Sequence, residues 1–175
     1  MTDVLSKLAG ADRRSIGKSA EVVADVLADP GLFGVLFEGM LDQDPVIRMR
    51  AADAIEKVTV SHPEYLAPYK TRLVHEVAQI DQQEVRWHVC QLVSRLKLTH
   101  AERRTVSVIL TGYLDDESRI VKTFAMQALA DLAEQDDGLR APVIRQIEEL
   151  TRSGSPAMQS RGRKLLAKLK GRRNV

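Results

Sequence analysis

The sequence predicts an all-α protein built from about four and a half repeated helix pairs. Three observations support this: a short pattern recurs at near-constant spacing, apolar residues follow the period of a helix, and no stretch alternates as a strand would. The pattern begins at Asp44 and Pro45. Aspartate caps a helix by accepting its first free amides, and proline fits the first helical position, so we expect a helix to begin there.

Residues 45 to about 60 carry an alanine-rich apolar stripe. Its members recur three and four residues apart, at Ile47, Ala51, Ala54, Ile55 and Val58. Small side chains allow a neighbouring helix to approach closely. We therefore expect this helix to bury its stripe by stacking on copies of itself.

Copies of this stretch follow along the chain. The position of Ile47 recurs at successive spacings of 38, 36 and 37 residues, at Val85, Val121 and Met158. A period of about this size, with two helices per unit, is typical of helical repeat arrays. The last copy is the most divergent, because Gly162 and Arg163 replace a pair of alanines. Such divergence is expected of a terminal repeat, which has a neighbour on one side only.

Residues 44–55 resemble the second helix of a HEAT repeat, whose signature has the form D-P-x-V-R-x-x-A-A-x-A-L. The signature is matched by Asp44, Pro45, Ile47, Arg48, Ala51, Ala52, Ala54 and Ile55. The resemblance implies a right-handed α-solenoid of antiparallel helix pairs, of the HEAT or armadillo type, whose second helices line a concave surface that binds partners. It places on that surface Met49, Asp53, Trp87, Gln91, Thr123 and Gln127.

Trp87 is the one tryptophan of the chain, and helical spacing rotates it off the stripe formed by Val85, Val89 and Leu92. Exposed tryptophans are enriched at the centres of binding interfaces, so Trp87 is a candidate anchor for a protein partner. The alternative is that the ring lies over the adjacent helix and completes the packing, because tryptophan is seldom left bare.

The chain is predicted to form a single domain, residues 1–175. Residues 1–30 form a degenerate N-terminal cap whose helix ends at Asp29-Pro30-Gly31. Helix pairs are expected at residues 31–62, 63–99 and 100–136, and a basic capping pair at residues 137–175.

Polar residues at fixed offsets mark the expected helix starts, since a side-chain oxygen there accepts free amides of the first turn. These starts are the capping boxes Ser61 to Glu64 and Thr99 to Glu102, the pair Asp81 and Glu84, Ser118, and Ser155-Pro156. The helix opened by Ser61 is expected to run to about Ile80.

A basic residue occupies the arginine position of the signature in three repeats, at Arg48, Arg86 and Lys122. In the HEAT family this residue typically pairs with an acidic residue of a neighbouring loop. The acidic loop residues available here are Asp44, Asp81 and Asp116. We expect such a ladder between repeats, and the alternative is a track that binds phosphate groups.

The C-terminal part of the chain is strongly basic. Eight basic and no acidic residues lie between Arg152 and Val175, whereas the rest of the chain has 18 basic and 24 acidic residues. Such a segment favours nucleic acid, an anionic membrane surface or an acidic protein as its partner. The candidate anion-binding residues are Arg161, Arg163, Lys164, Lys168 and Lys170. The alternative is a solvated cap that pairs with Glu148 and Glu149.

The sequence carries no recognisable catalytic or metal-binding motif. His75-Glu76 begins like a zinc-protease helix, but Gln79 stands where the second histidine should be. The single cysteine, Cys90, excludes an internal disulfide, and no apolar run is long enough to span a bilayer or to act as a secretory signal. A cytoplasmic protein without a cofactor is therefore expected.

These observations predict a non-enzymatic protein-binding module or scaffold. Nucleic-acid binding through the basic C-terminal helix is the alternative. DNA glycosylase activity, which some HEAT-like proteins have, is a third hypothesis, because a fold by itself does not determine function.

Overall fold

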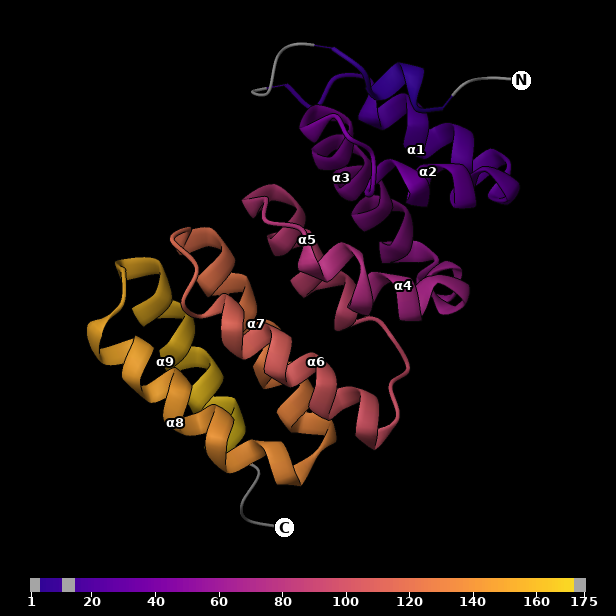
Figure 1. Ribbon diagram of the computed structural model, residues 1–175. Coiled ribbons are helices and arrows are strands. Elements are labelled where there is room, and N and C mark those ends of the chain that lie inside the picture. The colour runs from indigo at the N-terminus through magenta and orange to yellow at the C-terminus, as the bar shows by residue number, and fades with distance from the viewer. Residues whose placement is uncertain (1–3, 11–14, 172–175) are drawn as a thin grey trace. The chain divides into compact units, whose positions relative to one another are not determined.

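The computed structural model describes residues 4–10 and 15–171, and over these residues it is helical and contains no strand. This confirms the all-α prediction. The chain divides into two compact units, which comprise residues 1–96 and 97–175 (Figure 1).

The first unit is built around one long helix, α3 (Pro45–Ser61), which packs against α1 (Ser19–Ala28), α2 (Phe33–Gly39) and α5 (Gln83–Val93). Figure 1 shows α3 and α5 in violet and magenta. The remaining elements are α4 and four short 3-10 helices: η1 (Ser6–Leu8), η2 (Pro30–Leu32), η3 (Pro63–Tyr69), α4 (Lys70–His75) and η4 (Val77–Gln79).

Helix α3 begins as the sequence predicts. The Asp44 carboxylate accepts a hydrogen bond from the Val46 amide at 2.8 Å, and Pro45 is the first helical residue. Four members of the predicted stripe, Ala51, Ala54, Ile55 and Val58, are buried together with Ala52, whereas Ile47 is half-buried. Burial of this stripe supplies the main hydrophobic contact between α3 and its neighbours.

Arg50 of α3 is buried, with 3% of its surface exposed, although its sequence position gave no sign of this. Its guanidinium donates hydrogen bonds to the carbonyl oxygens of Leu8 at 2.8 Å, Ala9 at 2.9 Å and Ser15 at 3.0 Å. Gly17 has φ +56°, and a Cβ there would lie 2.9 Å from the Arg50 guanidinium carbon. The N-terminal segment therefore folds closely around a buried positive charge, which its carbonyl oxygens compensate.

Two of the predicted helix starts in this unit are wrong. Ser61 is the last residue of α3, and its hydroxyl donates to the Val58 carbonyl at 3.3 Å instead of capping the next helix. Asp81 does not cap α5, because the capping position is Gln82, which makes no side-chain cap. The helix expected from residue 63 to about 80 is broken into η3, α4 and η4, and Pro68 inside η3 lacks the amide that a continuous α-helix needs.

The second unit consists of α6 (His100–Tyr113), α7 (Arg119–Gln135), α8 (Asp137–Ser153) and α9 (Pro156–Gly171). Helix α7 packs against the other three, and α8 packs against α9. Three predicted starts are confirmed: Thr99 and Glu102 form both halves of a capping box, Ser118 caps α7, and Ser155 accepts from the Met158 amide at 3.4 Å. These caps depend only on residues two or three apart.

Polar contacts between distant elements recur at a similar sequence separation in both units. Many of the side-chain hydrogen bonds that join distant segments link residues 33 to 36 positions apart. In the first unit they include Ser19 with Asp53, Arg48 with Gln82, Arg72 with Glu38, and Arg95 with Thr59. In the second they include Arg103 with Asp136, Gln146 with Thr111, and Arg161 with Gln127.

Candidate functional site

The six residues predicted to bind a partner are divided between the two units. Met49 and Asp53 lie on α3 and Trp87 and Gln91 on α5, so these four belong to the first unit and form what we call the α3–α5 face. Thr123 and Gln127 lie on α7 of the second unit.

Trp87 is half-buried on the α3–α5 face. Its neighbours Val85, Val89 and Leu92 are fully buried, which confirms that α5 turns the tryptophan away from its apolar stripe. Met49 is also half-buried, and the two helices that carry these side chains pack against each other. Met49 and Trp87 each lie two residues after the matching positions Ile47 and Val85 of the recurring sequence pattern. The face thus presents two large apolar side chains that are partly accessible.

The polar members of the α3–α5 face are engaged by other residues of the first unit. The Asp53 carboxylate accepts hydrogen bonds from the Ser19 hydroxyl at 2.5 Å and from the Lys57 ammonium at 2.7 Å. The Gln91 amide lies 3.4 Å from the Trp87 carbonyl oxygen and 3.4 Å from Nδ1 of His88. Asp53 therefore joins α1 to α3, a structural role that the sequence did not reveal.

His88 lies next to this face and is 9% exposed, with its ring centroid 5.7 Å from that of Trp87. Burial is the main cause that lowers the pKa of His88 to about 4; Asp53 and Glu56 oppose this shift, and the positive charges of Lys57 and Arg95 add to it. The imidazole is therefore neutral at neutral pH. The sequence did not predict a buried polar side chain at position 88, because helical spacing places this position beside the buried apolar residues of α5.

Arg95, two residues beyond the end of α5, makes a further polar contact with α3. Its guanidinium forms an ion pair with the Glu56 carboxylate and donates to the Glu56 carbonyl at 2.6 Å and the Thr59 hydroxyl at 2.7 Å. Both charged side chains are about four-fifths buried, at 22% and 18% exposure. Hydrogen-bonded ion pairs shielded from water are stronger than exposed ones, so this contact fixes the two helices beneath the face.

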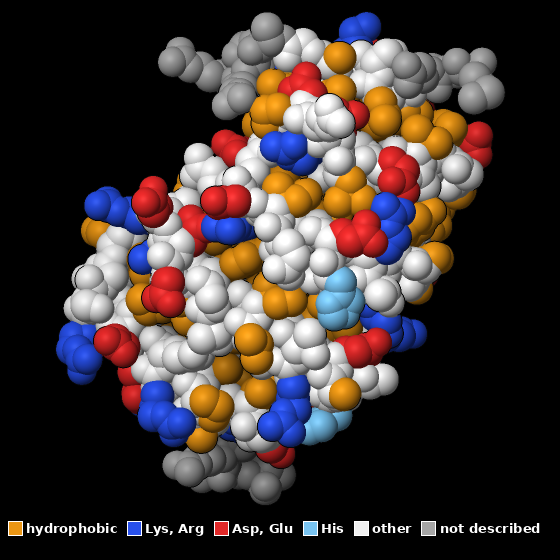
Figure 2. Space-filling view, in the orientation of Figure 1, with side chains coloured by type: hydrophobic (Ala, Val, Ile, Leu, Met, Phe, Trp, Pro, Cys, Tyr) orange, Lys and Arg blue, Asp and Glu red, His pale blue; other side chains and the backbone are white. Residues whose placement is uncertain are grey.

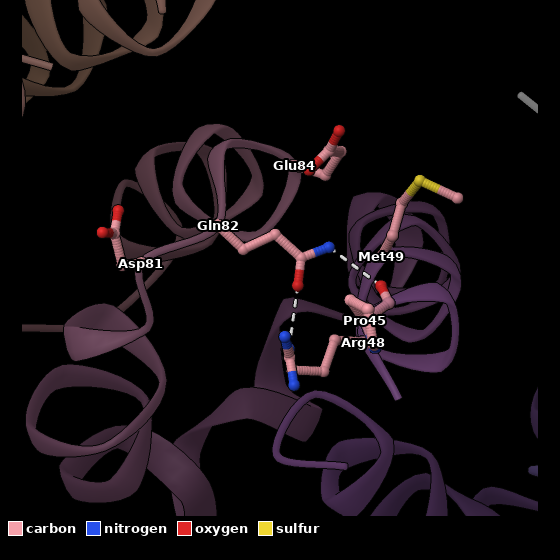
Figure 3. Close-up of a pocket in the computed structure, with 6 residues that line it drawn as sticks. All are labelled: Pro45, Arg48, Met49, Asp81, Gln82 and Glu84. Atoms are coloured by element: carbon pink, nitrogen blue, oxygen red, sulfur yellow. Dashed lines mark hydrogen bonds between the residues drawn. The ribbon is translucent and has the colours of Figure 1, made fainter. Parts of the chain in front are cut away.

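A pocket of about 190 Å³ lies where α3 and α5 begin. It is lined by Pro45, Arg48, Met49, Asp81, Gln82 and Glu84 (Figure 3). Figure 3 shows Gln82 reaching from the start of α5 toward α3, where its amide donates to the Pro45 carbonyl at 2.8 Å and accepts from Arg48 at 2.8 Å. Met49 and Glu84 point to the same side of this bridge. The pocket therefore combines two apolar and four polar or charged residues next to the α3–α5 face.

The expected ladder of basic residues and acidic loops is only partly present. Arg86 pairs with Asp81 at 3.1 Å, as predicted. The predicted ion pair of Arg48 with an acidic loop residue is wrong. Its guanidinium donates instead to the backbone carbonyls of Asp42 at 2.8 Å and Gln43 at 3.1 Å. The carbonyls lie at the end of the loop before α3, directly within reach of this side chain. Lys122 makes no ion pair with any residue that the structure describes.

In the second unit, a predicted partner-binding residue and a predicted anion-binding residue contact each other. Arg161 of α9 donates to the side-chain oxygen of Gln127 on α7 at 2.7 Å, and Gln127 in turn donates to Asp131 at 2.8 Å. The Thr123 hydroxyl donates to the Arg119 carbonyl at 2.7 Å within α7. Gln127 and Arg161 thus hold α7 and α9 together.

The other basic residues of α9 fall into two groups. Lys168 pairs with Glu134 at 2.8 Å and Lys170 pairs with Glu148 at 2.6 Å. The alternative of a solvated cap predicted pairing with Glu148 and Glu149; the first of these pairs is present, and Glu149 makes no ion pair with a described residue. In the view of Figure 2, Lys and Arg side chains lie beside Asp and Glu side chains over the helices of this unit. Arg163 and Lys164 are exposed and have no ion-pair partner among the described residues. Arg172 and Arg173 lie outside the described residues.

A second polar cluster joins α6 to α8. The buried Asp136 carboxylate caps α8 by accepting from the Gly138 amide at 3.0 Å, and it lies 2.7 Å from Nδ1 of His100 and 3.5 Å from Nε of Arg103. Burial alone would raise the pKa of Asp136, but the amide hydrogen bond and the charges of His100 and Arg103 outweigh it and hold the pKa below its ordinary value. This geometry is that of a helix cap tied to a neighbouring helix.

Over the part of the chain that the structure describes, no group of three or more His, Cys, Asp or Glu side chains has the arrangement of a metal site. Cys90 is buried between helices. None of the described helices is both long and apolar enough to cross a membrane. Comparison with family models, curated proteins and solved structures found no match to this chain.

Proposed function

We propose that this chain is a non-enzymatic, HEAT-like repeat protein that binds a protein partner through the α3–α5 face. Support for the repeat architecture comes from the polar contacts between distant segments, whose separation of 33 to 36 residues is close to the sequence period of 36 to 38. Contacts restricted to adjacent repeats are characteristic of solenoids. The arrangement proposed is a right-handed α-solenoid of about four and a half helix pairs.

The observation that carries the binding proposal is the position of Trp87. A large amphipathic ring that is half-buried costs little conformational entropy on binding and still offers much apolar surface to a partner. Met49 adds a second adaptable apolar side chain, since thioethers fit irregular partner surfaces. Asp53, Gln91 and Glu84 lie on the same two helices, so the apolar centre has polar residues around it. An apolar centre with a polar rim is the usual anatomy of a protein interface.

The polar cluster beneath the face favours the same proposal. The segments directly before and after α5 are tied to α3 at two points, by the bond from Gln82 to Pro45 and by the contacts of Arg95 with Glu56 and Thr59. A surface that is already fixed before binding loses less entropy when a partner docks. The face is therefore suited to bind as a rigid platform.

The test first uses the immobilised wild-type protein to capture partner proteins. The affinity of a captured partner for wild type and for Trp87→Ala is then measured by titration. Because Trp87 is the one tryptophan, its fluorescence emission reports directly on events at the face when the partner segment lacks tryptophan. We expect Trp87→Ala to weaken binding by about 30-fold or more, which corresponds to about 2 kcal/mol. Moderate salt should have little effect on this apolar contact.

Val60→Ala provides the matched control, because Val60 also lies on α3 and is 66% exposed but is outside the α3–α5 face. This variant should bind like wild type. Circular dichroism would verify that both variants are folded. A partner that binds wild type and Trp87→Ala with equal affinity would refute the assignment of the face.

A further inference from the structure

The outer side of α9 differs in charge from the rest of the molecule. Residues 97–175 contain 15 basic and 10 acidic residues, a net charge of +5, whereas residues 1–96 contain 11 basic and 14 acidic residues, a net charge of −3. Helix α9 itself has five basic residues and no acidic one. The excess positive charge of the second unit is therefore concentrated on its last helix.

Two of the five cations are neutralised by other helices. Lys168 and Lys170 are paired with Glu134 on α7 and Glu148 on α8. Arg161 is half-buried and donates to Gln127, which in turn donates to the Asp131 carboxylate. Arg163 and Lys164 are exposed on the outer side of α9, opposite the buried face of the helix. These two neighbouring cations thus have no ion-pair partner among the described residues.

The side chains around these cations are small. Apart from Lys168, which is paired with Glu134, the exposed positions of α9 near Arg163 and Lys164 are Ala157, Ser160 and Ala167. These small side chains leave room for an extended anionic surface to approach the two cations. Coulomb attraction across such a short, partly dehydrated contact is stronger than between fully hydrated charges.

The composition of this face decides between possible anionic partners. Among the described residues, the large hydrophobic side chains that are most exposed include Val108 on α6 and Ile120 on α7 but none on α8 or α9. A helix that binds a membrane surface inserts bulky apolar residues, and a protein interface centres on buried aromatic anchors, so this face fits neither. Helix α9 also has no aromatic residue on which unpaired bases could stack, which disfavours single strands.

We infer that the outer side of α9, centred on Arg163 and Lys164, binds the phosphate backbone of duplex nucleic acid without sequence specificity. Backbone contacts of this kind need only closely spaced cations on a flat surface. The negative net charge of residues 1–96 confines the attraction to the second unit. The inference is independent of the protein-binding proposal, because the two surfaces lie in different units and share no residue.

The test is a fluorescence anisotropy titration of a labelled random duplex of about 25 base pairs with the full chain, at 50 and 200 mM NaCl. With two or three phosphates contacted, affinity should fall roughly 10- to 40-fold between these concentrations, and non-specific dissociation constants of about 10⁻⁶ to 10⁻⁴ M are expected. Arg163→Glu combined with Lys164→Glu should abolish binding at 50 mM NaCl. Trp87→Ala should leave duplex binding unchanged.

The matched control reverses two exposed cations elsewhere in the same unit, Arg104 on α6 and Arg119 on α7, and so makes the same change in net charge. Arg104→Glu combined with Arg119→Glu should retain most of the duplex affinity. An equal loss in both double variants would overturn the inference, because net charge alone would then explain binding. Absence of duplex binding at 50 mM NaCl, or binding only to vesicles rich in phosphatidylserine, would also overturn it. Thermal melts would verify that all variants fold.

Discussion

Gly162 and Thr151 provide the sharpest test of how closely the helices of the second unit approach. A Cβ at Gly162 of α9 would lie 1.9 Å from the Thr151 hydroxyl oxygen, 3.1 Å from the Thr151 Cβ and 3.2 Å from the Met126 methyl carbon. The hydroxyl is held by a 2.6 Å hydrogen bond to the Ile147 carbonyl. Rotation of Thr151 could move its oxygen but not its Cβ, so the backbones would have to separate.

Gly162→Ala is therefore expected to destabilise the protein although alanine is the better helix former. The helical preference of alanine over glycine is about 1 kcal/mol, and overpacking a close contact costs about 1 to 3 kcal/mol. Because contacts at 1.9 and 3.1 Å must both be relieved, we expect the cost to lie near its upper limit, which leaves a net loss of about 1 to 2 kcal/mol. Urea denaturation followed by circular dichroism would measure this loss as a lower midpoint.

Two further variants make the reasoning refutable. Thr151→Ala in the Gly162→Ala background should recover about 1 kcal/mol or more relative to the sum of the single changes, since it removes the colliding oxygen. Gly112→Ala is the control, because a Cβ at this position of α6 meets nothing within 4 Å and should stabilise the helix slightly. If Gly162→Ala were as stable as Gly112→Ala, the close approach of α8 and α9 would be wrong.

Three more predictions concern other contacts. The pKa of His88 is about 4 in the folded protein and about 6.5 in the unfolded chain, so the unfolded state binds the proton first as the pH falls. This contribution to stability is therefore complete above about pH 6.5 and is lost progressively as the pH falls toward 4. The difference in unfolding free energy between wild type and His88→Gln should change by roughly 3 kcal/mol over that range, and a flat difference would contradict the assignment. Arg50→Met leaves three carbonyl oxygens without their donor, so it should cost about 3 kcal/mol or more in urea denaturation, and a loss below about 1 kcal/mol would argue against the buried contact. Ser118→Ala removes the cap of α7 and should cost about 1 kcal/mol, whereas Ser153→Ala, at an exposed helix end, should have a smaller effect in the same assay.

Local signals in the sequence predicted local structure well. The caps at Asp44, Thr99 and Ser118 involve residues two or three positions apart, so a short pattern contains all the information needed. The same kind of signal failed at Ser61. There α3 continues through the expected cap, and Pro68 then prevents the following helix from forming in one piece.

The sequence predicted the candidate surfaces only in part, because polar side chains are placed by partners far along the chain. Helical periodicity correctly turned Trp87 off the apolar stripe. It could not show that Asp53 is bound by Ser19, nor that Lys168 is paired with Glu134. Arg50 is the clearest case, since its burial depends on carbonyl oxygens 35 to 42 residues earlier. No pattern within one helix contains that information.

The polar contacts that join neighbouring elements also determine the order in which similar helices can assemble. The apolar stripes of α3 and α5 consist of interchangeable small and branched residues, which by themselves would tolerate a misordered stack. The polar pairs are not interchangeable, because α1 offers Ser19 to Asp53 whereas the segment directly after α5 offers Arg95 to Glu56. A chain that exchanged these partners would leave charged groups of α3 unpaired, at a high free-energy cost. The apolar stripes drive collapse, and the distinct polar pairs favour a single order of the helices.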